Sequence, residues 1–161
     1  MAKDQDYILD LCDRVVGEPS SRQHTFNFLV GLESRNTKRR HPLPVDAYYA
    51  DRNLVIEYHE CQHTRSVKFW NKMTACGLPR DEQRRCYDNL RRELLPKNGV
   101  ALVILDPQLF DLDGRGRLLR TEQDERVIGD ILKTAAANNS LLFDTEAYVG
   151  RLKGCPMCKR T

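Results

Sequence analysis

Residues 43–63 read LPVDAYYADRNLVIEYHECQH and contain the pattern that decides the predicted fold. Two short apolar runs, 43–49 and 53–59, are joined by a polar segment that is typical of a turn between adjacent strands. An acidic residue follows each apolar triplet, Asp46 in the first run and Glu57 in the second. Adjacent strands would bring both carboxylates to one cleft, where they could hold a hard divalent cation.

The composition predicts a single globular domain. The chain has 161 residues, of which 40% are hydrophobic and 30% charged, which suits one domain with its own core. No apolar run approaches the roughly 20 residues that span a bilayer, so we expect no membrane partner. The first residues, MAKDQD, do not resemble a secretory signal, which favours a cytoplasmic location with reduced cysteines. We expect one domain over 1–154 and a tail over 155–161.

The remaining pattern predicts an α/β order. Apolar residues at helical spacing predict four helices, over residues 4–16, 21–30, 80–95 and 122–138. The wholly apolar run VALVIL at 100–105 predicts a buried strand, and a last short element is expected around 141–152. Together with the two strands before it, this order predicts an α/β fold with a central mixed β-sheet flanked by helices.

Basic residues flank the acidic motif on both sides. One cluster precedes the motif and another follows it, at Arg35, Lys38, Arg39 and Arg40 and at Arg80, Arg84, Arg85, Arg91 and Arg92. Arginines of the second cluster are candidate ligands for DNA phosphates, namely Arg80, Arg84, Arg91 and Arg92. Two alternatives stay open: the clusters are solvated faces, or Arg91 pairs with an acid such as Asp88 in the core.

The two acidic segments resemble a known motif. Pro44-Val-Asp46 and Glu57-Tyr-His59 resemble the halves of the PD-(D/E)xK motif of the restriction-endonuclease-like superfamily, with histidine in place of the usual lysine. Within it, the chain is similar to the very-short-patch repair endonucleases, whose second strand is followed by a histidine, here His63. Their D-x-x-R-x-x-x-L-x-x-x-G pattern is matched by Asp88, Arg91, Leu95 and Gly99. The resemblance covers about residues 42–105.

This resemblance implies a restriction-endonuclease-like fold and an endonuclease, of restriction or repair type, that uses Mg²⁺ or Mn²⁺ to hydrolyse DNA. Asp46 and Glu57 would bind the metal ion, and Glu18 could add a carboxylate to it. His63 is the candidate base, because an imidazole with a pKa of about 6.5 can accept a proton from water. His59 would support the phosphate or the water at the lysine position. Glu60-Cys-Gln62 is an alternative second half of the motif.

The cysteines suggest a second kind of site. Cys155-Pro-Met-Cys158 has the spacing of half a zinc site, and Cys61 is a candidate further ligand. A structural Zn²⁺ and a reduced, unliganded tail both remain open. Two other functions therefore stand beside the nuclease: a nucleic-acid-binding module with a decayed catalytic site, and a zinc-stabilised interaction domain. The sequence leaves the oligomeric state open, a dimer included.

Overall fold

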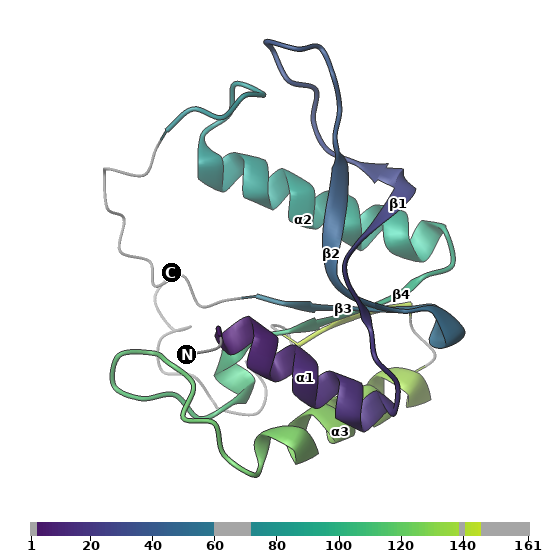
Figure 1. The fold of residues 1–161 in the computed structure, drawn as a ribbon, viewed down its shortest axis with the longest axis vertical. Helices are drawn as coiled ribbons and strands as arrows, with labels where there is room; N and C mark the ends of the chain where they lie inside the picture. The colour runs from purple at the N-terminus through teal and green to yellow at the C-terminus, as the bar shows by residue number, and fades with distance from the viewer. Residues whose placement is uncertain (1–2, 60–71, 139–140, 146–161) are drawn as a thin grey trace.

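The described residues form one five-stranded sheet with helices on both of its faces (Figure 1). The structure, a computed structural model, describes residues 3–59, 72–138 and 141–145. The strand order is β1-β2-β3-β4-β5; the first three strands pair antiparallel and the last three parallel. The predicted α/β class with a mixed sheet and flanking helices is therefore confirmed.

Most predicted elements are present with boundaries close to those expected. The elements are α1 (Asp4–Val16), β1 (Ser21–Val30), β2 (Pro42–Tyr49), the 3₁₀ turn η1 (Ala50–Arg52), β3 (Leu54–Tyr58), α2 (Arg80–Lys97), β4 (Ala101–Leu105), the 3₁₀ turn η2 (Pro107–Leu109), α3 (Asp124–Ala137) and β5 (Leu142–Asp144). The predicted turn between β2 and β3 is η1, closed by Asn53 in the left-handed conformation. None of the helices described here is long and apolar enough to cross a membrane.

The predicted helix over residues 21–30 is wrong, because this segment forms strand β1. Its exposed and half-buried residues alternate from Ser21 to Phe28, which is the period of a strand. The rings on the half-buried side pack onto β2: His24 and Phe26 lie 4.6 Å and 4.9 Å from the Tyr48 ring. Pairing with β2 therefore gives these aromatic residues a partner that an isolated helix would not offer.

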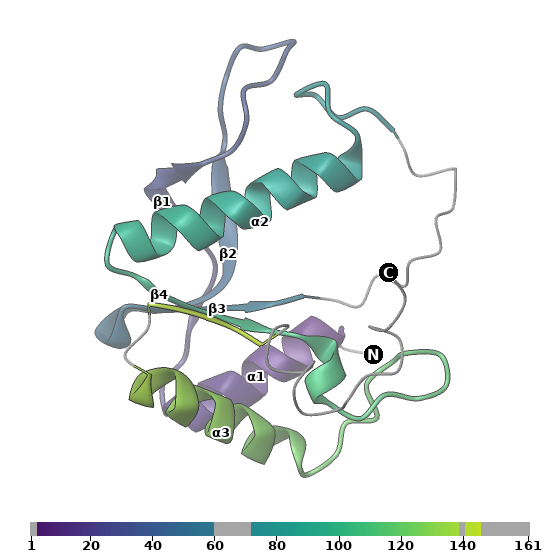
Figure 2. The same ribbon diagram turned by 180° about the vertical axis from the view of Figure 1, so that it is seen from behind.

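Two apolar layers hold the helices against the sheet. The view from behind shows α2 on one side of β3 and β4, and α1 and α3 on the other (Figure 2). On one face, α1 and α3 place Ile8 and Ile128 against Ile56, and each of these side chains is fully buried. On the other face, α2 places Leu95 against Val55. Because both faces of the central strands are covered, β3 and β4 are apolar almost throughout, as the sequence predicted for the run at 100–105.

Strand β2 changes direction at Asp46. Leu43 and Val45 pack in the apolar layer beneath α2, whereas Ala47 and Tyr49 pack in the layer beneath α1 and α3. Alternate residues of a regular strand share one face, so the chain must turn between the two pairs. The backbone pairing with β3 also ends at Ala47. Beyond this point β2 leaves β3 and continues only with β1.

Candidate active site

Asp46 and Glu57 lie side by side where β2 and β3 separate. The Asp46 backbone N–H donates to Glu57 Oε1 at 3.1 Å, and the Tyr58 backbone N–H donates to Asp46 Oδ2 at 3.0 Å. These two side-chain bonds begin just beyond the last backbone pair of the ladder, Ala47 with Ile56. Each carboxylate thus satisfies an amide of the opposite strand, and the structure brings both predicted acids into one site.

Burial makes this pair hold a proton. Glu57 is only 5% exposed, and burial, followed by the neighbouring charge of Asp46, raises its pKa to about 8. Burial also raises the pKa of Asp46, although the Tyr58 amide and the Arg91 charge oppose this rise. At neutral pH, ionisation of both groups together is therefore disfavoured, and Glu57 tends to keep its proton.

Arg91 is the basic partner of this pair and lies in the interior. Its side chain is 16% exposed, and its Nε lies 3.5 Å from Glu57 Oε1 without hydrogen-bond geometry. Its Nη2 donates to the Pro44 carbonyl at 2.9 Å, and Nη1 lies 3.3 Å from Asp88 Oδ1. Arg91 is not presented as a surface phosphate ligand; its position matches the alternative expectation, pairing with Asp88.

Helix periodicity explains why Arg91 turns inward. It lies one helical turn after Tyr87, which packs against the apolar layer under α2, so both occupy the same helix face. The other arginines differ. Arg92 donates to Asp144 Oδ2 at 2.7 Å, while Arg80 and Arg84 are exposed near the start of α2. Of the four arginines predicted to bind phosphate, Arg80 and Arg84 thus have the exposure that this contact requires.

His59 and Gln5 complete the surroundings of Asp46. His59 follows β3, where its N–H donates to the Leu105 carbonyl at 3.0 Å, and its charge acts to lower the pKa of Asp46. Gln5, in the first turn of α1, forms a side-chain hydrogen bond with Asp46. Sequence reasoning missed Gln5, because nothing in the polar face of an amphipathic helix marks which polar side chain meets a strand end.

Glu18 is not brought to the pair. Gln5 contacts Asp46 from the first turn of α1, whereas Glu18 follows the end of that helix, whose 13 residues span about 20 Å. There Glu18 Oε1 lies 3.6 Å from Arg52 Nε of η1. The prediction that Glu18 adds a carboxylate to the metal is therefore not supported, because it follows the opposite end of the helix.

The remaining predicted ligands fall on other parts of the chain. His63, Cys61, Cys155, Cys158 and the alternative Glu60-Cys-Gln62 register lie outside the described residues. Within the described ranges, no group of three His, Cys, Asp or Glu side chains is arranged to hold a metal ion. Of the predicted metal ligands in the described residues, Asp46 and Glu57 lie together and Glu18 does not.

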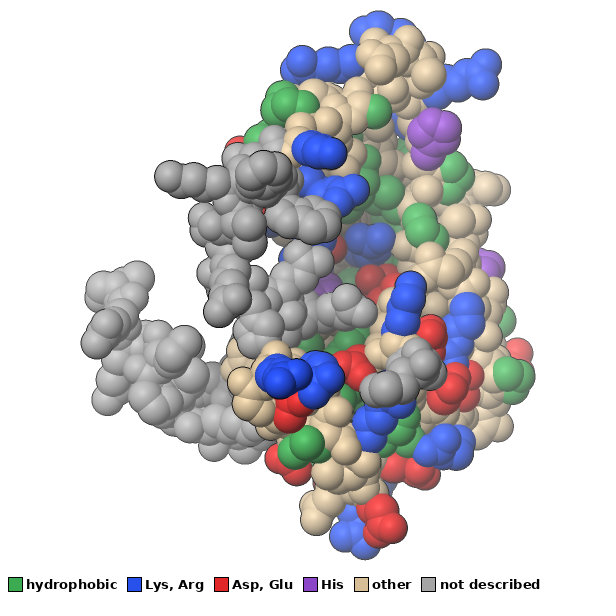
Figure 3. All heavy atoms as spheres, turned by 60° about the vertical axis from the view of Figure 1, so that its left-hand side comes forward, with side chains coloured by type: hydrophobic (Ala, Val, Ile, Leu, Met, Phe, Trp, Pro, Cys, Tyr) green, Lys and Arg blue, Asp and Glu red, His purple; other side chains and the backbone are tan. Residues whose placement is uncertain are grey.

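Two carboxylates suit a hydrated cation better than an all-protein cage. Mg²⁺ keeps several waters and commonly binds one or two carboxylates together with substrate phosphates. In the surface view, acidic, basic and histidine side chains meet in a hollow of the molecular surface (Figure 3). Binding a cation requires Glu57 to lose its proton, so metal loading and the charge of the pair are coupled.

Comparisons with known proteins do not assign this site. No family model, no curated protein and no solved structure matches the chain. Functional inference therefore depends on the chemistry of the Asp46–Glu57 pair and on the groups around it.

Proposed function

We propose that the protein is a Mg²⁺-dependent endonuclease that hydrolyses DNA phosphodiester bonds and has a restriction-endonuclease-like fold. The observation that supports this most strongly is the buried acidic pair, Asp46 and Glu57, joined across two separating strands. A purely structural role does not require two mutually repelling acids with raised pKa values at a strand opening. A cation would relieve that repulsion.

The residues around the pair have separable roles. Asp46 and Glu57 would hold the cation, which when bound polarises the phosphoryl group and lowers the pKa of its water. His59 stands next to Asp46 at the position of the motif lysine and would contact the phosphate or the water. Arg91 ties α2 to the Pro44 carbonyl and is a positioning residue. His63 stays the predicted base, outside the described residues.

A second candidate is a nucleic-acid-binding module without catalysis. The observation that favours it is the Arg91 guanidinium, whose Nε lies 3.5 Å from Glu57 Oε1. This positive charge partly offsets the negative charge of the Asp46–Glu57 pair in the absence of a metal ion. Histidine instead of lysine at position 59 points in the same direction. The two candidates differ in one measurable property, which is cleavage that depends on the metal and on both acids.

Cleavage of supercoiled plasmid tests the proposal. The purified protein, Asp46→Asn and Glu57→Gln are each incubated with the plasmid in EDTA, Mg²⁺ or Mn²⁺, and nicked and linear products are quantified. Amide variants are chosen because they keep an oxygen that accepts the Tyr58 or Asp46 amide. Loss of one metal carboxylate should lower the cleavage rate by about 100-fold or more, because metal-bound charge stabilisation contributes several kcal/mol.

Matched variants away from the site serve as controls. Asp51→Asn in η1 and Glu93→Gln on α2 change exposed acids and should cleave at the rate of the unmodified protein. Cleavage by Asp46→Asn and Glu57→Gln at that same rate would refute the assignment, since it would indicate a contaminating nuclease. Binding of DNA by the unmodified protein without cleavage in either metal would instead support the second candidate.

A further inference from the structure

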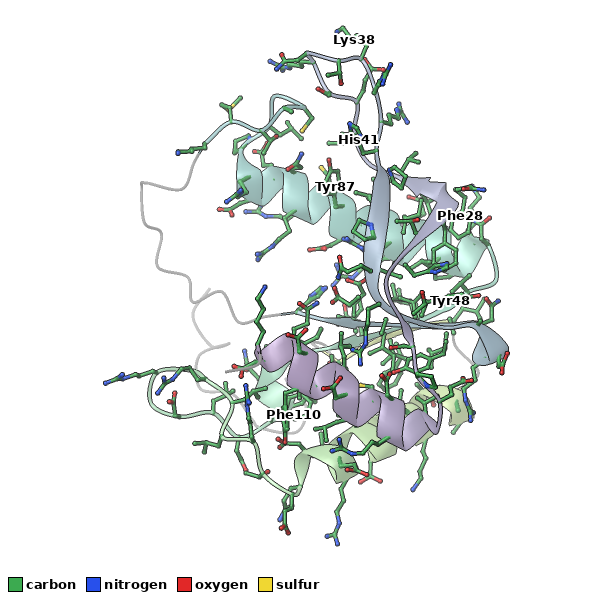
Figure 4. The ribbon with its side chains drawn as sticks, viewed as in Figure 1. Phe28, Lys38, His41, Tyr48, Tyr87 and Phe110 are labelled. Carbon is green, nitrogen blue, oxygen red and sulfur yellow. The ribbon has the colours of Figure 1, made fainter. Side chains whose placement is uncertain are left out.

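The connection between β1 and β2 is a projecting arm with a basic tip. Lys38 lies at its far end, well beyond His41 and the helix α2 (Figure 4). Lys38, Arg39 and Arg40 are all exposed. No acidic residue occurs between Glu33 and Asp46 in the sequence, so no neighbour along the arm offsets these three charges.

The tip is a closed turn rather than an open loop. The Ser34 N–H donates to the Arg39 carbonyl at 2.9 Å, and the Lys38 N–H donates to the Ser34 carbonyl at 2.9 Å. Nearer the sheet, the Gly31 N–H donates to the His41 carbonyl at 2.8 Å. Lys38 adopts a left-handed φ of 54°, which reverses the chain at the tip. These bonds fix the backbone from which the three basic side chains extend.

The turn at the tip is braced through Arg35 against the segment that leads into α2. The Arg35 N–H donates to the Ala75 carbonyl at 2.8 Å. The Arg35 guanidinium occupies the space that a Cβ on Gly77 would need, so a larger residue there would displace it. Gly77 also has a φ of +80°, which favours glycine for a second reason. The arm therefore has a set direction relative to the site.

The arm leads directly into β2, the strand that carries Asp46. Arg40 and Asp46 are six residues apart in largely extended chain, a span of about 20 Å at 3.3 Å per residue. Double-stranded DNA rises 3.4 Å per base pair, so this span corresponds to roughly six base pairs. In the surface view, the basic side chains at the tip are seen on the same face as the hollow where acidic, basic and histidine side chains meet (Figure 3).

We infer that the tip of the β1–β2 arm, Lys38, Arg39 and Arg40, contacts the backbone of duplex DNA about six base pairs from the bond to be cut. This inference rests on the proposed function, because the position of the cut is defined by Asp46 and Glu57. Three adjacent cations on a braced turn suit phosphates, which are repeated along the duplex. The arm would add affinity and fix the register of the DNA, without taking part in the chemistry.

Salt-dependent binding tests the arm. The variant K38S/R39S/R40S is compared with K97S/R126S/K133S, which removes three exposed charges from α2 and α3. A fluorescein-labelled 30-base-pair duplex is titrated with each protein in Ca²⁺, over 50–300 mM KCl. Log affinity falls linearly with log salt, and each lost phosphate contact makes this slope less steep by about 0.9. We expect the tip variant to lose at least one such contact and about tenfold in affinity, and the control variant to lose neither.

Cleavage and crosslinking separate this inference from the proposed function. In Mg²⁺ the tip variant should show a raised KM with an unchanged kcat. A p-benzoylphenylalanine at position 39 should crosslink DNA about six base pairs from the cleaved bond, at 3.4 Å per step. If the tip variant matches the control variant in both cleavage and salt slope, the inference about the arm is wrong and the proposed nuclease function is unaffected. If DNA binding depends on the tip but no cleavage occurs, the proposed nuclease function is wrong and the arm is supported as a DNA-binding element.

Discussion

Replacing Glu57 by glutamine should make the metal-free protein less sensitive to alkaline pH. Burial and the charge of Asp46 raise the pKa of Glu57 from 4.5 to about 8. Between these two values, the folded protein keeps a proton that the unfolded chain releases. Folding is thus coupled to proton uptake, and stability falls as pH rises through this window. Glutamine resembles the protonated form at every pH, so its variant lacks this loss.

The size of the effect follows from linkage. With a folded pKa of about 8 and an unfolded pKa of 4.5, the unfolding free energy should fall by about 2 kcal/mol between pH 6 and pH 8. Glu57→Gln should lose little over the same range. The sign is opposite to that of a carboxylate in a stabilising ion pair, whose contribution is lost on acidification. At pH 8 the variant should therefore be the more stable of the two proteins.

Urea unfolding followed by circular dichroism at pH 6, 7 and 8, in EDTA, measures this difference. Glu93→Gln is the matched control, because it makes the same change at an exposed position of α2. Saturating Mg²⁺ should restore the stability of the unmodified protein at pH 8 and leave Glu57→Gln almost unaffected. A pH dependence shared by all three proteins would refute the reasoning, since the proton would then be bound elsewhere.

Three further outcomes follow from the same contacts. Mg²⁺ affinity measured by calorimetry should rise about tenfold per pH unit from pH 6 to 8, because Glu57 must lose its proton, and a flat profile would contradict this. Arg91→Met should lower the unfolding free energy by about 3 kcal/mol in urea titrations, whereas exposed Arg85→Met should change it by under about 0.5. Tyr49→Phe removes a 2.7 Å bond from a buried hydroxyl to Asp13 and should cost about 1–2 kcal/mol in thermal unfolding; an unchanged melting temperature would count against that bond.

The fold could be predicted where the spacing of apolar residues agrees with the turn residues that bound a segment. The run at 100–105 is wholly apolar and bounded by Gly99 and Asp106-Pro107, and it forms the buried strand β4 as expected. The prediction of a helix over residues 21–30 is wrong because their apolar pattern fits both the helical and the strand period. Phe26, Leu29 and Val30 have helical spacing, while Phe26 and Phe28 have strand spacing. Pairing with β2 decides between them, and that partner cannot be read from the segment itself.

The site was predictable to the extent that it is local. Asp46 and Glu57 meet because their strands are consecutive and joined by a short turn, so the sequence contains the pairing almost directly. The roles of Arg91 and Gln5 depend on how α2 and α1 pack on the sheet. Helical spacing shows that Arg91 shares a face with Tyr87, but only the packed structure shows which acid that face meets.

The bend in β2 and the acidic pair are one feature of the fold. Where the ladder ends, backbone amides lose their usual partners, and buried amides must find others. Glu57 accepts a hydrogen bond from the Asp46 amide and Asp46 accepts one from the Tyr58 amide, so each acid also joins the two strands beyond the end of the ladder. An alanine at either position would remove both the structural acceptor and the metal ligand. Only the amide variants keep the acceptor while removing the charge, so loss of cleavage in Asp46→Asn, with unfolding unchanged, would assign the charge to catalysis rather than to the bend.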